Sequence, residues 1–253
     1  MQIIDTHAHL YTTEFDADRP AVMEAAVRAG VGPILLPAID GATHEAMLRV
    51  EAEYPVCKAM MGLHPCHVKE NYEEELKLVQ EYLARRPFVA VGEIGLDFHW
   101  DTTFMEQQYD AFHRQIRMAL EYGLPISIHS RKATEESIEV IRQYPGLRGV
   151  FHCFSGTTAQ AEALIGLGFY LGIGGVVTYK NSDLGQVIGA VGLSNVILET
   201  DAPYLAPVPK RGKRNESAYL TFVIDKISNV LGRGAEEISK ITTENAKKLF
   251  VLS

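Results

Sequence analysis

The chain has 253 residues, of which 47% are hydrophobic, and it carries a formal net charge of −8. This apolar content supplies a substantial core for one large α/β barrel or for two small domains. The negative charge argues against broad, non-specific adhesion to nucleic acid or to acidic membranes, but it does not exclude a local basic site.

The sequence also indicates the cellular compartment of the protein. No apolar stretch approaches the roughly 20 residues needed to cross a bilayer, and strand-like residues begin at Ile3 without a basic and apolar leader before them. The three cysteines are scattered and odd in number, which disfavours a disulfide framework and suits a reducing compartment. We therefore expect a cytoplasmic protein that binds no membrane. No low-complexity tract or repeat marks a linker, so we expect one domain over residues 1–253.

Short apolar or β-branched runs alternate with amphipathic segments along the chain. The eight runs that predict strands are residues 3–5, 33–36, 56–61, 88–91, 126–128, 149–151, 169–173 and 196–198. Helical spacing relates Tyr72, Leu76, Val79 and Leu83, and likewise Phe112, Ile116, Ala119 and Leu120. Repeated strand–helix units predict parallel pairing, and eight strands close a (β/α)8 TIM barrel. An open doubly wound sheet is the alternative, although it would separate the first and last strands.

Side chains of metal-ligand type follow five of these runs. His7 and His9 follow the first, and because alternate strand residues share a face, both imidazoles should point the same way. The fourth, fifth, sixth and eighth runs end in Glu93, His129, His152 and Asp201. The carboxyl ends of barrel strands meet at one mouth, and imidazole and carboxylate are standard ligands of divalent metals. The pattern predicts a catalytic metal site, and a buried polar network is the competing interpretation.

The chain resembles the TatD family of metal-dependent deoxyribonucleases, within the wider amidohydrolase-like barrel superfamily. The resemblance runs essentially from end to end. It rests on Asp5-Thr6-His7-Ala8-His9, Gly62-Leu63-His64-Pro65, Gly92-Glu93-Ile94-Gly95-Leu96-Asp97, Pro125-Ile126-Ser127-Ile128-His129-Ser130-Arg131, His152-Cys153-Phe154-Ser155-Gly156, Glu199-Thr200-Asp201-Ala202-Pro203-Tyr204 and Arg211-Gly212-Lys213-Arg214-Asn215. A lone pair of alternate histidines would be weak evidence, whereas all of these motifs in order are specific.

The resemblance implies a centre of two divalent metal ions. His7, His9 and Asp201 would hold one ion with Glu93, while Glu93, His129 and His152 would hold the second, so that Glu93 bridges them. Many relatives in the superfamily bridge their metals with a carbamylated lysine, but residues 88–95 contain no lysine. The ligand types suit Zn, Mn or Co better than Mg, whereas the family is usually described as dependent on Mg or Mn.

Such a pair of metals suits phosphodiester hydrolysis. Two cations about 3.5–4 Å apart stabilise the attacking and the leaving oxygen, and they lower the pKa of bound water to about 7. The leading hypothesis is a hydrolase that cuts DNA, as a 3′→5′ exonuclease on single-stranded ends. Asp201 would accept the proton from the attacking water, with Glu93 as the second catalytic residue. His64 and Arg131 could contact a phosphate oxygen.

Two further segments suggest contacts with a nucleic acid. Residues 203–209 contain three prolines and favour an extended loop, and its far end carries Lys210, Arg211, Lys213 and Arg214. Arg211 and Arg214 would attract a polyanion, with a solvated surface turn as the alternative. Phe98, His99 and Trp100 could stack on an unpaired base or simply pack at the rim.

The other candidate residues are given no ligand role. His44, His67, His99 and His113 lack partners in the pattern and are left outside the metal shell. Cys153 alternates with His152 and is expected to face away from the barrel interior, as a packing residue. The role of Cys66 is left open.

Two other functions compete with the nuclease. The first is a metallohydrolase of an ester or amide, such as an aminoacyl-tRNA linkage or a small cyclic amide. The second is a metal-dependent nucleic-acid binder without catalytic activity.

Overall fold

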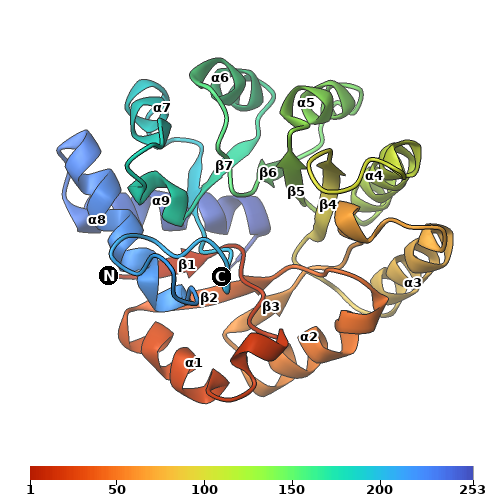
Figure 1. Ribbon diagram of the computed structural model, residues 1–253, viewed down its shortest axis with the longest axis horizontal. Coiled ribbons are helices and arrows are strands. Elements are labelled where there is room, and N and C mark those ends of the chain that lie inside the picture. Colours follow the sequence, from red (N-terminus) through yellow and green to blue (C-terminus); the bar gives the residue numbers. More distant parts are fainter. Residues whose placement is uncertain (253) are drawn as a thin grey trace.

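The eight strands of the chain form the inner layer of a barrel (Figure 1). A computed structural model describes residues 1–252. The strands are β1 Ile3–Asp5, β2 Val31–Leu36, β3 Cys57–Ala59, β4 Val91–Asp97, β5 Ile126–Arg131, β6 Gly149–Phe151, β7 Tyr170–Ile173 and β8 Val196–Leu198. All paired neighbours are parallel and follow chain order, in one group from β1 to β3 and another from β4 to β8.

Isolated contacts join these two groups into a closed barrel. A parallel bridge between Met61 and Val91 connects the segment after β3 to β4. A second bridge, between Ala8 and Ala202, connects the segments that follow β1 and β8. The Thr6 backbone N–H also donates to the carbonyl oxygen of Leu198 at 3.0 Å. Because the first and last strands are neighbours, the predicted (β/α)8 barrel is confirmed and the open sheet is excluded.

Helices surround the strands on the outside. The α-helices are α1 Arg19–Arg28, α2 Gly41–Glu53, α3 Tyr72–Arg85, α4 Met105–Tyr122, α5 Thr134–Arg142, α6 Thr158–Gly166, α7 Leu184–Val191, α8 Leu220–Leu231 and α9 Ala235–Phe250. The short 3-10 helices are η1 Thr13–Phe15, η2 Pro65–His67, η3 Gly175–Thr178 and η4 Ser217–Tyr219. Within residues 1–252, no helix combines the length and the apolar character needed to span a membrane.

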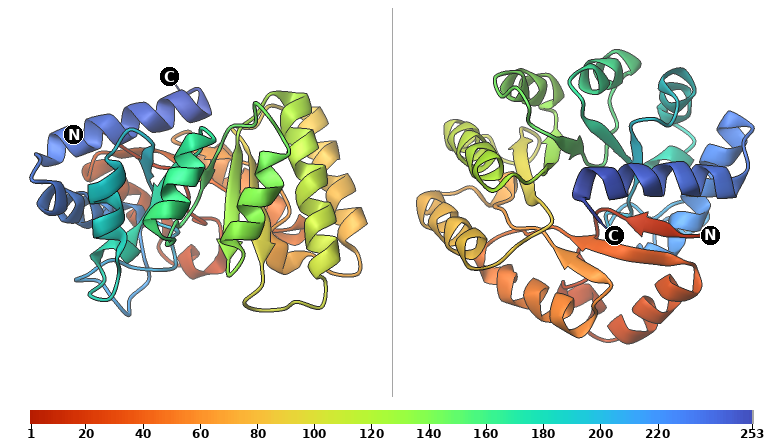
Figure 2. Two further views of the ribbon diagram at one scale, coloured as in Figure 1. Left: turned by 90° about the horizontal axis from the view of Figure 1, so that it is seen from above. Right: turned by 180° about the vertical axis from the view of Figure 1, so that it is seen from behind.

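The last helix, α9, covers the end of the barrel where the strands begin (Figure 2, right). Ala246, Leu249 and Phe250 pack there against inward-facing residues of the strands, among them Ile4 and Val150. The hydroxyls of Ser239 and Thr243 both donate to the carbonyl of Gln2, just before β1. Because α9 closes this end with apolar side chains, the opposite mouth is the one left for polar chemistry.

The fourth strand is the one whose position the sequence predicted poorly. It runs over Val91–Asp97 and overlaps the predicted range 88–91 at Val91 alone. Glu93 therefore lies within the strand and not at its end. The glycines at 92 and 95 resemble a turn signal, but Gly95 has a φ of 140° inside the strand, and a Cβ there would lie 2.1 Å from the His129 carbonyl oxygen. Glycine is needed here because the neighbouring backbone comes so close.

Candidate metal centre

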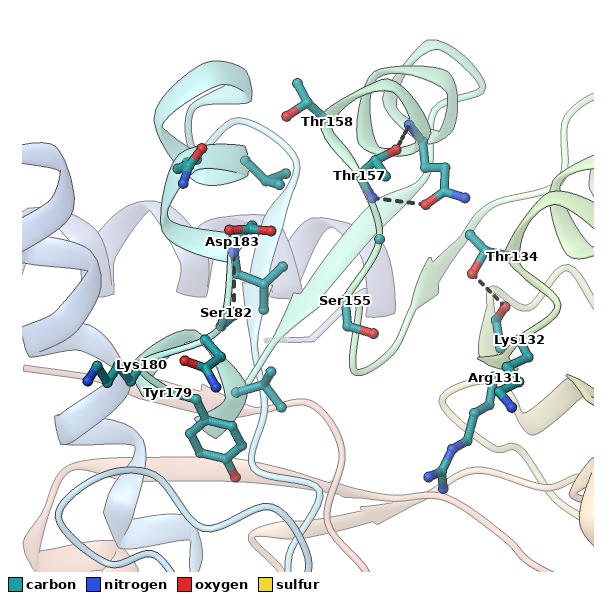
Figure 3. A pocket seen from close by; sticks show the side chains of 18 of the residues that line it. Arg131, Lys132, Thr134, Ser155, Thr157, Thr158, Tyr179, Lys180, Ser182 and Asp183 are labelled. Atoms are coloured by element: carbon teal, nitrogen blue, oxygen red, sulfur yellow. Dashed lines mark hydrogen bonds between the residues drawn. The ribbon is translucent and has the colours of Figure 1, made fainter. Parts of the chain in front are cut away.

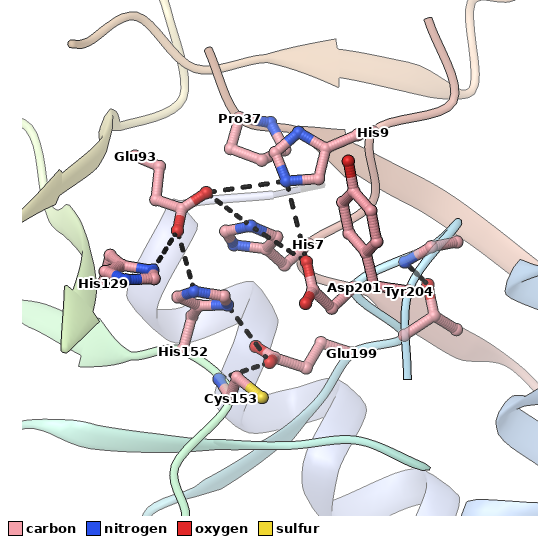
Figure 4. Close-up of polar contacts among 12 residues, drawn as sticks. His7, His9, Pro37, Glu93, His129, His152, Cys153, Glu199, Asp201 and Tyr204 are labelled. Carbon is pink, nitrogen blue, oxygen red and sulfur yellow. Dashed lines mark hydrogen bonds and ion pairs between the residues drawn. The ribbon is translucent and has the colours of Figure 1, made fainter. Parts of the chain in front are cut away.

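The predicted ligands lie together at the open mouth of the barrel (Figure 4). Glu93 is at their centre and is 2% exposed. Its Oε2 atom lies 3.1 Å from His7 Nε2 and 3.5 Å from His9 Nε2. Its Oε1 atom lies 2.9 Å from both His129 Nδ1 and His152 Nε2. One buried carboxylate thus contacts imidazoles that come from the first, fifth and sixth strands or the residues just after them.

Asp201 completes the group from the segment after β8. Its Oδ1 atom lies 3.6 Å from His9 Nε2 and 3.9 Å from His7 Nε2. The backbone φ of Asp201 is 57°, in the left-handed region that residues other than glycine seldom adopt. Burial raises the pKa of the Asp201 carboxyl to about 6. A divalent cation beside it would oppose this rise, because an opposite charge favours the carboxylate.

The ionisable side chains around Glu93 favour a bound positive charge. Burial alone would raise the pKa of Glu93, but the imidazoles of His152, His64 and His7 hold it well below its usual range. Burial opposes a charge on His152, yet Glu93 and Glu199 raise its pKa well above the ordinary value. The carboxylates thus draw a proton onto His152. A metal ion would take the place of that positive charge, since ligand imidazoles must be neutral.

The tautomer of His9 can be read from its hydrogen bonds. The Tyr11 hydroxyl donates to the carbonyl oxygen of Pro37 at 2.7 Å, so its oxygen must accept from His9 Nδ1, 3.1 Å away. In the neutral ring, the lone pair of Nε2 then faces the carboxylates of Glu93 and Asp201. A lone pair turned toward two carboxylates is favourable only if a cation lies between them, so this side chain fits a metal ligand.

The other three imidazoles also have a polar group behind them. His129 Nε2 donates to Asp97 Oδ2 at 2.8 Å, which leaves Nδ1 toward Glu93. His152 Nδ1 faces Glu199 at 3.4 Å, and His7 Nδ1 lies 3.3 Å from the Ser127 hydroxyl. Groups in these positions orient ligand histidines and raise their basicity. The donor set therefore fits divalent cations, and His7, His9, Glu93, His129, His152 and Asp201 are the residues that would hold them.

His64 differs in that its protonated nitrogen, and not its lone pair, faces Glu93. The backbone N–H of Cys66 can only donate, and it bonds His64 Nδ1 at 3.0 Å. Burial lowers the pKa of His64 to about 4, so the ring is neutral near pH 7 and its proton must be on Nε2. That N–H donates to Glu93 Oε1 at 3.1 Å. His64 therefore presents a hydrogen-bond donor to the cavity, where the four other imidazoles can present lone pairs.

A third cluster of ligand-type atoms is less suited to metal. His64, Cys66 and His129 offer atoms within 4.8 Å of one another. However, His64 Nδ1 is used by a backbone N–H, and His129 Nε2 is used by Asp97. Burial beside Asp97 also raises the pKa of the Cys66 thiol to about 12, so it is protonated. Because these donors are already committed, we assign no ligand role to Cys66.

Three buried carboxylates that contact the candidate ligands or the segments carrying them were present in the motifs but were not identified from sequence. Asp97 orients His129, and Glu199 lies behind His152 and accepts from the Cys153 backbone N–H. Asp5 accepts two hydrogen bonds from Thr200, at 2.9 and 2.7 Å, and so ties β1 to the segment after β8. The available signal was their place within the same motifs as the candidate ligands, such as Glu199-Thr200-Asp201.

The predicted substrate contacts are divided between two regions. The ligands line a cavity of about 710 Å³, which His64, Arg131 and Trp100 also line. Arg211 lines the neighbouring cavity. Arg214 lines neither of them, because its guanidinium is held by Asp18 at 2.7 and 2.8 Å and by Glu216 at 3.3 Å. We therefore leave Arg214 out of the substrate contacts considered below.

Other predictions at the rim need correction. Phe98 packs against the hydrophobic core, so of residues 98–100 it is Trp100, 68% exposed, that lines the cavity. Cys153 was expected to face away, but it lines the cavity. Strand alternation ends with β6 at Phe151, and Cys153 has a φ of 46°, which turns its side chain. His44, His67, His99 and His113 are absent from the candidate metal groups of residues 1–252.

The chain is similar to known proteins over nearly its whole length. A family model described as TatD related DNase matches residues 4–251. YabD of Bacillus subtilis, named an uncharacterized metal-dependent hydrolase, is 38% identical over 251 residues, which cover 98% of each chain. A protein of Erwinia tasmaniensis named 3′-5′ ssDNA/RNA exonuclease TatD is 32% identical over 259 residues, covering 99% of this chain and 100% of the relative.

A solved structure agrees with these sequence relatives. The crystal structure of YjjV, a TatD homolog from Escherichia coli K12, has a TM-score of 0.94 and 33% sequence identity, and the match covers 99% of this chain and 98% of that one. The barrel, the group of imidazoles and carboxylates at its mouth and the family match are mutually consistent. The chain belongs to the TatD family of metal-dependent hydrolases.

Proposed function

We propose that this protein is a nuclease that uses two divalent cations to hydrolyse phosphodiester bonds at the 3′ end of single-stranded DNA. The observation that carries the proposal is the placement of Glu93, whose two oxygens face separate sets of imidazoles. A carboxylate in that position is suited to bridge two ions. The relative from Erwinia tasmaniensis, which is named as an exonuclease of this kind, supports the choice of substrate.

The cations would be held in two groups. His7, His9 and Asp201 would hold one and His129 and His152 the other, with Glu93 shared between them. When bound, such cations supply Lewis acidity, which acidifies water and neutralises charge on the phosphate oxygens. Imidazole and carboxylate ligands favour Zn, Mn or Co over Mg.

The chain's own residues would bind and orient the phosphodiester. Asp201 is the candidate to accept a proton from the attacking water, because its carboxylate lies at the edge of the group and is 15% exposed. His64 Nε2–H, turned into the cavity, would donate to a phosphate oxygen in place of Glu93. Arg131, an exposed cation at the same rim, would offset the phosphate charge.

The proposal is tested by a cleavage assay with end-labelled strands. Protein stripped of metal and reloaded with Mg, Mn, Co or Zn is incubated with single- and double-stranded DNA and with RNA. We expect shortening of single strands from the 3′ end. Glu93→Gln should lower the rate by about a thousandfold or more, because it removes the shared charged ligand. Elemental analysis of the same variant should show loss of bound metal.

A matched control separates this effect from a general loss of charge. Glu121→Gln changes an exposed glutamate of α4 and should leave both cleavage and metal content as in the wild type. If wild type and Glu93→Gln leave every strand equally uncut while a small ester or amide is hydrolysed, the metallohydrolase alternative replaces the nuclease. Binding of DNA without turnover of any substrate would instead leave a metal-dependent binder.

A further inference from the structure

A second and larger cavity opens beside the metal cavity. Its volume is about 1000 Å³, and it lies among the loops that follow β5, β6 and β7 (Figure 3). The two cavities share lining residues, namely Ser130, Arg131, Ser155, Val176 and Tyr179. The two cavities are therefore adjacent, and a ligand that extends out of the metal cavity past these shared residues would reach the second one.

The second cavity is positively charged, although the chain as a whole is acidic. Arg131, Lys132, Lys180 and Arg211 line it, against one acidic residue, Asp183. Among residues 1–252, none of these four cations has a carboxylate oxygen within 4.0 Å. This contrasts with Arg214, which the fold pairs with two carboxylates. The protein leaves the charge of this cavity unneutralised, as a site for an anionic ligand does.

The remaining lining groups suit a polynucleotide better than a lipid or a peptide. Ser155 and Thr158 line the cavity alongside the cations, as does Thr157, whose hydroxyl caps α6. The Tyr179 ring offers an aromatic surface, and the Arg211 guanidinium lies 3.9 Å from its centroid. Proteins that bind single strands combine a cationic groove with aromatic and guanidinium surfaces of this kind.

We propose that this cavity, here named the strand groove, binds the nucleotides that follow the one held in the metal cavity. Lys132 and Lys180 would contact backbone phosphates from opposite sides of the groove, in the loops after β5 and β7. The inference rests on the proposed function, because it takes the metal cavity to hold the end of the same strand. It predicts that affinity rises with strand length until the groove is filled.

The test measures binding separately from cleavage. The double variant Lys132→Ala/Lys180→Ala is compared with wild type and with Lys240→Ala/Lys248→Ala, which removes two exposed cations of α9 at the far end of the barrel. Each metal-loaded protein is titrated into fluorescent strands of about 12 nucleotides, whose terminal linkages are phosphorothioates that resist cutting. Fluorescence anisotropy gives the affinity for DNA and for RNA as salt is raised.

The expected result is a change in salt dependence. With phosphate contacts from Arg131 and Arg211 as well as the two lysines, wild-type affinity should fall about fiftyfold between roughly 50 and 200 mM salt, and loss of the two lysine contacts should reduce this to about sevenfold. The α9 variant should behave as the wild type does. In cleavage of strands of increasing length, KM of the groove variant should no longer fall as the strand lengthens, and its loss on long strands should exceed its loss on a small phosphodiester.

Each contrary outcome has a definite meaning. The strand groove is overturned if its double variant keeps the wild-type affinity and salt dependence, even when the protein cuts DNA as proposed. Polyglutamate that binds with the same dependence on Lys132 and Lys180 would overturn the assignment to nucleic acid. If the wild type cuts no strand but its binding still depends on these lysines, the nuclease proposal fails and the groove remains.

Discussion

At the end of the barrel where the strands begin, the inward-facing side chains are apolar, whereas at the opposite end they are imidazoles and carboxylates. The change takes place over two residues where single strands end. Val150 in β6 belongs to the apolar cluster beneath α9, and His152, two residues later, contacts Glu93. Ile197 in β8 belongs to the same cluster, and Glu199 follows it at the same spacing. Residues two apart in a strand share a face, and His152 and Glu199, each one residue past its strand, keep this spacing.

This comparison separates stability from chemistry. Apolar burial stabilises the fold in proportion to the area removed from water. Buried carboxylates and imidazoles are instead costly unless partners or cations compensate them. We therefore expect substitutions beneath α9 to change the free energy of unfolding, and substitutions at the mouth to change metal binding and activity.

The largest effect on stability is expected from Phe250→Ala. Phe250 is 3% exposed and packs on the strands beneath α9. Its truncation should lower the free energy of unfolding by about 3–5 kcal/mol, because it leaves a cavity in the floor of the barrel. Urea unfolding measures this loss, and elemental analysis of the folded variant should show the wild-type metal content. The control Val27→Ala, at a residue 61% exposed, should stay within about 0.5 kcal/mol of the wild type.

At the mouth, two histidines turn different ring nitrogens toward Glu93, and this difference predicts different results for their substitution. His64→Ala removes a donor, so kcat should fall by about 100- to 1000-fold while the metal content stays unchanged. His129→Ala removes a proposed ligand and should lower the metal content as well. Steady-state kinetics with elemental analysis separates the two effects. Loss of metal from His64→Ala equal to that from His129→Ala would mean that the tautomer of His64 is assigned wrongly.

A smaller effect on metal binding should follow from changing Asp97, which is hydrogen-bonded to the proposed ligand His129. Asp97→Asn weakens the hold on His129 Nε2, and metal affinity should fall by about 10- to 100-fold. Isothermal titration with the metal measures this change directly. Asp225→Asn, at an exposed position of α8, is the control and should bind metal as the wild type does. A fall in activity with unchanged metal affinity would assign Asp97 to another role.

The smallest effect concerns a charge at the mouth that lies outside the metal group. Asp40 caps α2 through Thr43 and pairs with His67 at 2.7 Å, and these contacts lower its pKa to about 2 although burial opposes them. Asp40→Ala should cost about 1 kcal/mol at neutral pH. Because the folded pKa lies below the unfolded value, this stabilisation is present above pH of about 4 and is lost as pH falls toward about 2.

Urea unfolding at several pH values tests this last prediction. The difference between wild type and Asp40→Ala should shrink as the pH is lowered through that range. Asp225→Ala is the matched control, since Asp225 is exposed and caps no helix. A difference that stays constant with pH would show that the Asp40 charge contributes nothing beyond its hydrogen bonds.

Much of the barrel, and the proximity of the candidate ligands, was predictable from sequence. The bounds of β1, β6 and β8 agree with the predicted runs, because short apolar segments between helices have few other conformations available. His7, His9, Glu93, His129, His152 and Asp201 could be grouped because parallel strands in one barrel must end at the same mouth. Errors arose where a local signal was ambiguous, as at the glycines of β4, or where alternation stopped, as at Cys153.

The amino-acid order by itself determined that eight strand–helix units form, and which side chains follow each strand. Only the tertiary structure decided which carboxylate stands behind which imidazole, which ring nitrogen carries the proton, and which cations remain unpaired. Examples are the contacts of Asp97 with His129, of Tyr11 with His9 and of Asp18 with Arg214. They depend on side-chain contacts between separate segments, and a hydrogen bond has geometric requirements that spacing along the chain does not specify.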